Sequence, residues 1–193
     1  MGICTAIVRI ETGSGGYAMF KKILIATDGS AHAQKAVEIG ADLAAQHQAE
    51  VHLVHVMLSG EIDEDLRRMV ETEHLDDLHH QDGGDPQASA QLVPGLPVRF
   101  SATDPASIRV LQALGTEVLN RASSVVRAHG VKQVSTHLME GDAVEQIAKV
   151  IQEERPDLVV SGARGLSSLS QLVLGSVSTE IAQLSPVTCV TVR

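Results

Sequence analysis

The sequence contains almost no aromatic residues: they make up 2% of its 193 positions, and tryptophan is absent. Because hydrophobic residues still account for 44% of the chain, the core has to be built from Val, Ile, Leu and Ala. These are the residues that usually fill parallel strands buried between helices. The length suits one globular domain with a substantial core. The composition therefore favours an α/β fold.

Cysteine and basic residues are also scarce. Cys4 and Cys189 form neither a metal-type spacing nor a disulfide framework, which fits a reducing cytoplasm. The 24 acidic and 15 basic residues give a formal charge of −9, which argues against the broad positive surface that nucleic-acid binding normally uses. No apolar run approaches the roughly 18 residues of a membrane span, and no secretory signal is visible. We therefore expect a cytoplasmic protein with no membrane span and no nucleic-acid partner.

The regular pattern starts at Met19, so we interpret residues 1–18 as an N-terminal extension of a domain that covers 19–193. The extension could be a flexible tail, a short extra strand or the product of a misplaced start codon. Within the domain, residues 57–107 interrupt the pattern and are interpreted as an insertion.

Five apolar segments predict strands, at 22–27, 51–56, 133–138, 157–162 and 187–192. Between them, apolar residues at helical spacing predict four helices. The first places Ala33, Ala36, Val37, Gly40 and Ala44 on one face, and the second places Leu111, Leu114, Val118, Ala122 and Val125 on one face. The third helix starts after Asp142 as N-cap, with Glu145 three residues later. The fourth covers about 177–184.

This alternation of strands and helices predicts a doubly wound, five-stranded parallel sheet with helices on both faces and strand order 3-2-1-4-5. Ligands of such sheets bind beyond the carboxyl ends of the strands, where the winding direction reverses. The loops at that point are "TDGS", at 27–30, and "GARG", at 162–165.

The second loop opens the stretch "GARGLSSLSQLVLGSVST", residues 162–179. Its glycines allow close approach of the backbone, and the helix that follows Gly175 offers free amides to a phosphate. A few hydrogen bonds to a charged group, each worth about 1.5–3 kcal/mol, would hold an anion without a lysine. The chain has no Walker A motif, because Gly-Lys-Ser/Thr does not occur in it.

The spacing of Gly162, Gly165, Gly175 and Ser176 resembles the ATP-binding signature of the universal stress protein family. The segments "KILIATDGS", "VHLVHV" and "PVTCVTV" also resemble that family in order and placement. The resemblance implies a five-stranded parallel fold, ATP binding and a homodimer. The long segment at 57–107 departs from the family's pattern.

The resemblance also implies the nucleotide site, with Asp28 approaching the adenosine, Val56 beside the adenine, and the glycine loop and following helix around ribose and phosphates. A structural role competes with this, since Asp28 could form a turn, the serines could be N-caps, and Arg164 could simply be solvated. The candidate nucleotide-binding residues are Ala26, Thr27, Asp28, Val56, Gly162, Arg164, Gly165, Gly175, Ser176, Val177 and Ser178.

Two classes of function follow. In the first, favoured here, binding of ATP with Mg²⁺ regulates conformation, dimerisation or an unidentified protein partner in a stress response. In the second, the protein is an enzyme that slowly hydrolyses ATP or transfers a nucleotidyl or phosphoryl group. Asp28 is the only carboxylate expected at the loops, and it suits ribose or magnesium better than general-base catalysis. Pairing of the last strand with a second copy would cover an apolar sheet edge.

The insertion is expected to contain a short amphipathic helix and a Pro/Gly/Ser-rich loop, which could act as a lid, a docking arm or an inert insertion. His74, His79 and His80 lie in it among carboxylates, and we expect them to face solvent without a metal. No chemistry is assigned to His52, His55, His137 or Cys189, because strand histidines and cysteines usually have a packing role.

Overall fold

The computed structural model describes residues 19–58, 105–165 and 175–193. The chain divides into two compact units, one formed by residues 1–59 and 109–193, the other by residues 60–108. Only the first turn of one helix is described in the second unit, so the fold given below is that of the first. No described helix is both long enough and apolar enough to cross a membrane.

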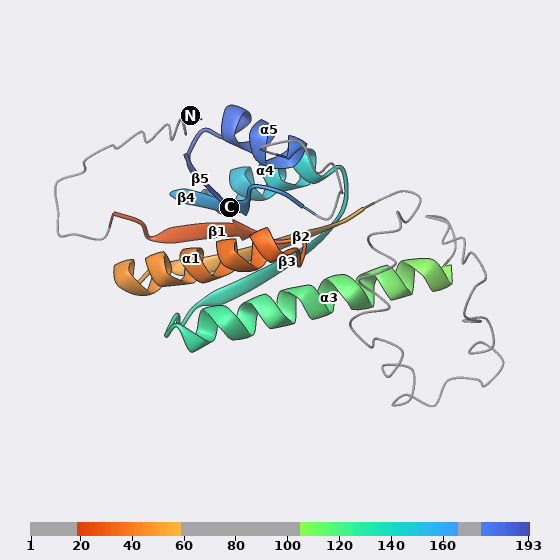
Figure 1. The fold of residues 1–193 in the computed structure, drawn as a ribbon, viewed down its shortest axis with the longest axis horizontal. Coiled ribbons are helices and arrows are strands. Elements are labelled where there is room, and N and C mark those ends of the chain that lie inside the picture. Colours follow the sequence, from red (N-terminus) through yellow and green to blue (C-terminus); the bar gives the residue numbers. More distant parts are fainter. Residues whose placement is uncertain (1–18, 59–104, 166–174) are drawn as a thin grey trace. The chain divides into compact units, whose positions relative to one another are not determined.

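The predicted parallel sheet is confirmed. Its strands are β1 (Lys22–Ala26), β2 (Glu50–Leu58), β3 (Val134–Gly141), β4 (Leu158–Gly162) and β5 (Thr188–Val192). They pair in the order β3-β2-β1-β4-β5, and every pair is parallel. The carboxyl ends of β1 and β4 are neighbours at the centre of the sheet, where the winding direction reverses (Figure 1).

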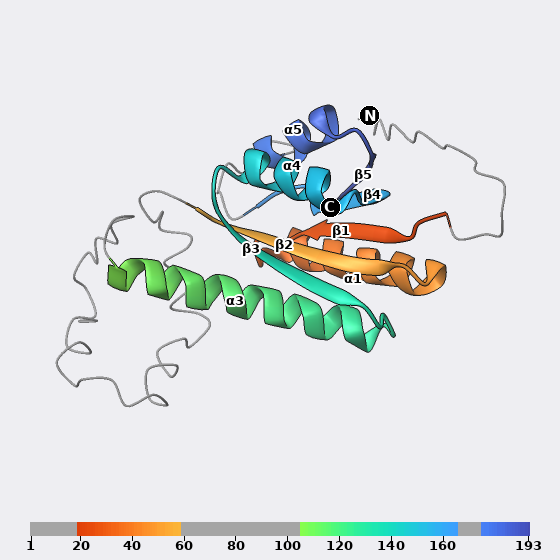
Figure 2. The same ribbon diagram turned by 180° about the vertical axis from the view of Figure 1, so that it is seen from behind.

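Four described helices cover the sheet: α1 (Ala31–His47), α3 (Pro105–Ala128), α4 (Ala143–Glu154) and α5 (Ser176–Leu184). One core cluster joins α1 and α3 to the face of the sheet that carries Ile23, Ile25 and Leu53. The second cluster joins α4 and α5 to the opposite face, with Leu24 and Val54. The two layers of helices can be followed from both sides (Figures 1 and 2).

Helical spacing predicted the buried face of α1 correctly, since all five residues of the predicted stripe are buried. In α3 the most buried side chains are Leu119, Ala122 and Val126, so the contact face is rotated by about one residue from the predicted stripe. The reason is Gly115, where a Cβ would lie 2.6 Å from Leu138 Cδ1. The helix approaches the sheet along this glycine, which an apolar pattern does not mark.

Two helices begin with side-chain caps. The Ser30 hydroxyl accepts a hydrogen bond from the Ala33 amide at the start of α1. The predicted cap of α4 is confirmed, because Asp142 Oδ1 accepts from the Glu145 amide at 3.0 Å. Both caps fix where the chain turns from a loop into a helix.

The predicted insertion falls mostly outside the described residues. Met57 and Leu58 end β2, and residues 105–107 begin α3. The amphipathic helix predicted within it, the three histidines and the extension at 1–18 lie outside the described residues. They stay predictions.

Replacing Leu53 with Ala should destabilise the fold by about 2–5 kcal/mol, because Leu53 is fully buried in the centre of the sheet and the change leaves a cavity. Chemical denaturation monitored by circular dichroism measures this difference. Leu184→Ala is the matched control: its side chain is 68% exposed, and we expect a change within about 0.5 kcal/mol. Equal losses in the two variants would contradict the described core.

Candidate functional site

The two loops predicted to form the site lie against each other. Ser30 Oγ donates a hydrogen bond to the Arg164 carbonyl at 3.3 Å, which joins the loop after β1 to the loop after β4. The Ser30 amide donates to Asp28 Oδ1 at 3.0 Å, so the Asp28 side chain is held by its own turn. Ser30 therefore caps α1 and positions both loops. It was not among the predicted site residues, although the Asp-Gly-Ser sequence before a helix is a signal for such a cap.

Close packing explains two glycines of the motif. A Cβ on Gly162 would lie 2.8 Å from the Ala33 amide nitrogen, so the first turn of α1 rests directly on the end of β4. A Cβ on Gly165 would lie 2.5 Å from Asp28 Oδ2, so this carboxylate lies against the backbone of the second loop. Gly162 thus excludes larger residues even without a ligand, because the clash is with backbone, whereas a side chain at Gly165 would displace the Asp28 carboxylate.

Ala163 connects the second loop to α5. Its carbonyl accepts hydrogen bonds from the Gly175 amide at 2.7 Å and from Ser178 Oγ at 3.2 Å. Its amide donates to the Val192 carbonyl of β5 at 2.6 Å. The start of α5 is thereby fixed next to the end of β4. The buried Ser178 hydroxyl donates to this carbonyl and to that of Gly175, so its hydrogen is used within the protein.

The N-terminus of α5 has no side-chain cap. Gly175 is the N-cap and provides no side-chain cap, and the Thr179 amide donates to the Gly175 carbonyl at 3.1 Å. The amides of Ser176, Val177 and Ser178 precede this bond and so have no acceptor in the helix. Such amides, together with the helix dipole, favour a negative group.

Gly175 differs from the other two glycines of the motif. Its φ is −73°, which any residue adopts, and a Cβ would make ordinary contact with the Ala163 carbonyl oxygen at 3.4 Å. Packing of the described residues therefore does not require glycine here. A glycine that the fold does not require is what close approach of a ligand to the helix N-terminus would explain.

The other predicted residues occupy two environments. Ala26 and Val56 are half-buried and pack against the core cluster under α4 and α5. Thr27 is buried, and its hydroxyl accepts from the Gly29 amide at 3.3 Å. The side chains of Arg164, Ser176 and Val177 are exposed. The apolar and the amide-rich parts thus both belong to the carboxyl end of the sheet.

His55 forms a hydrogen bond with the loop after β1, a role that was not predicted. Its Nδ1 lies 2.8 Å from the Thr27 carbonyl, which can only accept, so Nδ1 carries the hydrogen. Burial lowers the pKa of His55 from its ordinary 6.5, while the Thr27 carbonyl and Asp28 act in the opposite direction. The signal in the sequence was alternation: His55 follows Val51 and Leu53 on the same face of β2.

Comparisons with known proteins agree with this fold. The model of the universal stress protein family matches residues 19–193. Universal stress protein YxiE of Bacillus subtilis is 29% identical over 91% of this chain and 100% of its own length. Universal stress protein Sll1654 of Synechocystis sp. is 29% identical over 92% of this chain and 88% of its own.

Solved structures give the same result at the level of the fold. Universal stress protein UspA from Lactobacillus plantarum superimposes with a TM-score of 0.61 at 19% identity, covering 90% of this chain and 97% of its own. A universal stress protein in complex with cAMP has a TM-score of 0.56 at 18% identity, with coverage of 90% and 97%.

Protonation of His55 should destabilise the protein at mildly acidic pH. Because the pKa of His55 is lowered by folding, the unfolded state binds more protons below about pH 6.5, and stability falls as pH falls through this range. Wild type should therefore lose stability between about pH 7.5 and 5.5 more steeply than His55→Gln, by up to about 1.4 kcal/mol per pH unit.

Urea denaturation at several pH values measures the two slopes. The pKa of His52 is also lowered, mainly by burial, and His52 titrates in both proteins, so the difference between the slopes isolates His55. Parallel slopes would mean that His55 titrates in the folded protein as it does in the unfolded chain.

Proposed function

This chain belongs to the universal stress protein family, and we propose that it is a regulatory protein whose conformation or partner binding depends on a bound ATP. The observation that carries the proposal is the uncapped N-terminus of α5, fixed by Ala163 beside the loop that contains Asp28. In doubly wound sheets this is where nucleotides bind. The family provides the stress-response context.

The phosphates would bind to backbone amides rather than to basic side chains. The amides of Ser176, Val177 and Ser178 point along the start of α5, and Gly175 leaves the approach open. This arrangement is compatible with a net charge of −9, because the field of the helix end is local. Arg164, which is exposed at the same loop, is available as an additional phosphate contact.

The nucleoside would lie on the side of the first loop. Ala26 and Val56 supply half-buried apolar surface, which suits an adenine ring. Asp28 suits the ribose hydroxyls or a Mg²⁺ ion bound with the phosphates, since hard cations prefer carboxylate and phosphate oxygens. The role of Mg²⁺ here is to neutralise phosphate charge.

Two alternatives involve the same site. The first is a cyclic nucleotide, because one structural relative was solved in complex with cAMP. The second is an enzyme, for which ATP would be turned over. The described loops argue against turnover. Asp28 is the single carboxylate in residues 26–30 and 162–165, and its Oδ1 accepts a hydrogen bond from the Ser30 amide. A general base has to be positioned on the attacking group instead.

Isothermal titration calorimetry should give a micromolar Kd for Mg-ATP, about −8 kcal/mol. Gly175→Val should weaken binding by a hundredfold or more, because the branched side chain blocks at least two charge-assisted hydrogen bonds worth about 1.5–3 kcal/mol each. The fold should remain, since the backbone at Gly175 accepts any residue. Gln183→Val places the same side chain near the other end of α5 and should bind like wild type.

The same titration with ADP, cAMP and GTP distinguishes the alternatives. Tight binding of cAMP with weak ATP binding would replace the proposed ligand, and unchanged ATP affinity in Gly175→Val would remove the phosphates from α5. In the regulatory function, ATP is recovered intact after incubation. Turnover within the range of about 1–10³ s⁻¹ would favour the enzyme.

We also propose that β5 pairs with β5 of a second copy. Among the described strands it pairs with β4 alone, so its other edge has no strand partner in the described part of the chain. Val190 is unsuitable for a test of this pairing, because it packs against the core and its replacement by Lys would disturb the fold itself. Thr191 is a better position for the test. The Val192 carbonyl points towards β4, and backbone groups alternate in direction along a strand, so the N–H of Thr191 points away from β4.

Light scattering should therefore report a dimer for wild type and a monomer for Thr191→Pro, which removes an outward N–H without removing a bond to β4. Thr191→Val is the control that keeps the N–H and should stay dimeric. A monomeric wild type at working concentrations would refute pairing through β5.

A further inference from the structure

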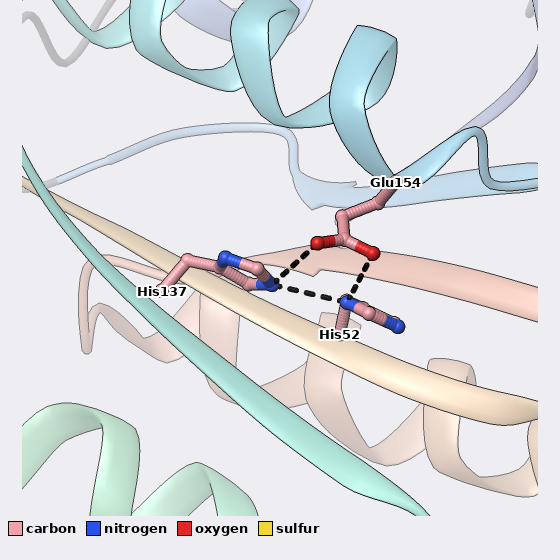
Figure 3. A group of neighbouring side chains, drawn as sticks. All are labelled: His52, His137 and Glu154. Carbon is pink, nitrogen blue, oxygen red and sulfur yellow. Dashed lines mark hydrogen bonds and ion pairs between the residues drawn. The ribbon is translucent and has the colours of Figure 1, made fainter.

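A cluster of potential metal ligands lies at the amino end of the sheet. The loops proposed to bind the nucleotide, at 27–30 and 162–165, lie at the opposite, carboxyl end. His52 comes from β2, His137 from β3 and Glu154 from the last position of α4 (Figure 3). In the strand register His52 is opposite Ser135 and His137 is opposite Val54, so the two rings are diagonal neighbours on one face of the sheet. The face is the one covered by α4, whose C-terminus brings in the carboxylate.

The ligand atoms have the spacing of a zinc site. His52 Nδ1 lies 3.0 Å from His137 Nε2 and 3.4 Å from Glu154 Oε2, and His137 Nε2 lies 4.0 Å from Glu154 Oε1. In a tetrahedral site with bonds of about 2.0–2.1 Å, neighbouring ligand atoms are about 3.3 Å apart. The separation of the two ring nitrogens and the distances from the rings to the two Glu154 oxygens bracket this value. One ligand atom from each residue can be chosen so that all three lie within 4.8 Å of one another, so side-chain rotations would bring them onto one ion.

The surroundings support the same arrangement. His52 Nε2, the nitrogen facing away from the cluster, lies 3.7 Å from Glu50 Oε1. A carboxylate behind a ligating histidine is the usual outer partner in zinc sites, where it orients the ring. The side chain of His52 is 9% exposed, whereas those of His137 and Glu154 are 20% and 28% exposed. An ion could therefore enter from the side of β3 and α4 and keep a water as fourth ligand.

A lysine occupies part of the same space. Lys22 Nζ lies 3.4 Å from Glu154 Oε2 and 3.1 Å from Glu50 Oε1. Lys22 therefore compensates the two carboxylates when no ion is bound, and it competes with a cation for Glu154. The second carboxylate oxygen of Glu154, which faces His137, is the one that a metal could take without displacing the lysine.

We propose that His52, His137 and Glu154 form a binding site for a divalent cation of the zinc class. Imidazole nitrogens with one carboxylate are a donor set that selects zinc over magnesium or calcium, which prefer oxygen ligands. The ion would tie the C-terminus of α4 to β2 and β3. The site is independent of the nucleotide loops and of the ATP function.

The test is a zinc titration of the full chain against a chromogenic chelator. Wild type should bind Zn²⁺ at this site, and His137→Gln and Glu154→Gln should each weaken it by at least about tenfold, since loss of even an outer partner costs about 10–100-fold. Zn²⁺ should also raise the unfolding temperature of wild type and not that of the variants. Glu154→Gln keeps the size of a partly exposed side chain, so this variant provides a readout even where a histidine variant unfolds.

Two histidine controls locate the ion. His129→Gln changes a histidine that bonds the Val125 carbonyl and Asp42, and it should bind zinc like wild type. The double change of His79 and His80 to Gln removes histidines of the insertion and should keep the site as well. Unchanged affinity in both His137→Gln and Glu154→Gln would overturn the proposal, as would loss of zinc only in the insertion variant.

Lys22→Met provides a test in the opposite direction. Removing this positive charge at a few ångströms should tighten zinc binding by at least about fivefold, the effect of one unit charge near 4 Å in a water-like medium. If the three side chains only form hydrogen bonds with one another, zinc affinity should not increase in this variant. Unchanged or weaker binding in Lys22→Met would therefore count against an ion at Glu154.

Discussion

The carboxyl end of the sheet depends on the backbone of one buried residue, Ala163. Its amide donates to β5, and its carbonyl holds both the Gly175 amide and the Ser178 hydroxyl at the start of α5. A helix whose start is fixed by the end of β4 presents its amides at a defined place. The neighbouring Arg164 carbonyl accepts from Ser30, which adds the loop after β1 to the same arrangement. The candidate nucleotide site is thus built largely from main-chain groups.

The three glycines of the motif differ in how far packing accounts for them. Gly162 allows α1 to touch the backbone, so the fold itself requires it, and Gly165 leaves room for the Asp28 carboxylate in its observed position. Gly175 has room for a side chain and an ordinary φ, so packing of the described residues does not account for the glycine, and close approach of the proposed ligand would. One short sequence thus combines a glycine that packing requires with a glycine that leaves space for the proposed ligand, and the three-dimensional structure distinguishes the two.

The sequence predicted the sheet order, the four described helices and the cap at Asp142, because these depend on local periodicity and on rules of chain connection. It did not predict the position of the contact face on α3, where a glycine rather than an apolar side chain makes the closest approach. It also assigned no chemistry to His52 and His137. Their proximity to Glu154 depends on strand register and on where α4 ends, and neither is visible in a local pattern.

The polarity of the fold connects the two proposed sites. In a doubly wound parallel sheet every helix begins near the carboxyl end of the strands and ends near the amino end. Free amides therefore gather at one end and free carbonyls at the other, which favours anions and cations respectively. At the carboxyl end, α5 begins without a side-chain cap, which suits phosphate.

At the amino end, α4 finishes at Glu154, and the chain already brings a cation, Lys22, to this carboxylate. Two histidines whose ring nitrogens are 3.0 Å apart lie beside the same carboxylate. Only one hydrogen fits between these nitrogens, so one of them offers a lone pair. A divalent cation could bind both nitrogens in place of that hydrogen. The direction in which the helices run would thus place the proposed nucleotide site and the proposed metal site at opposite ends of one sheet.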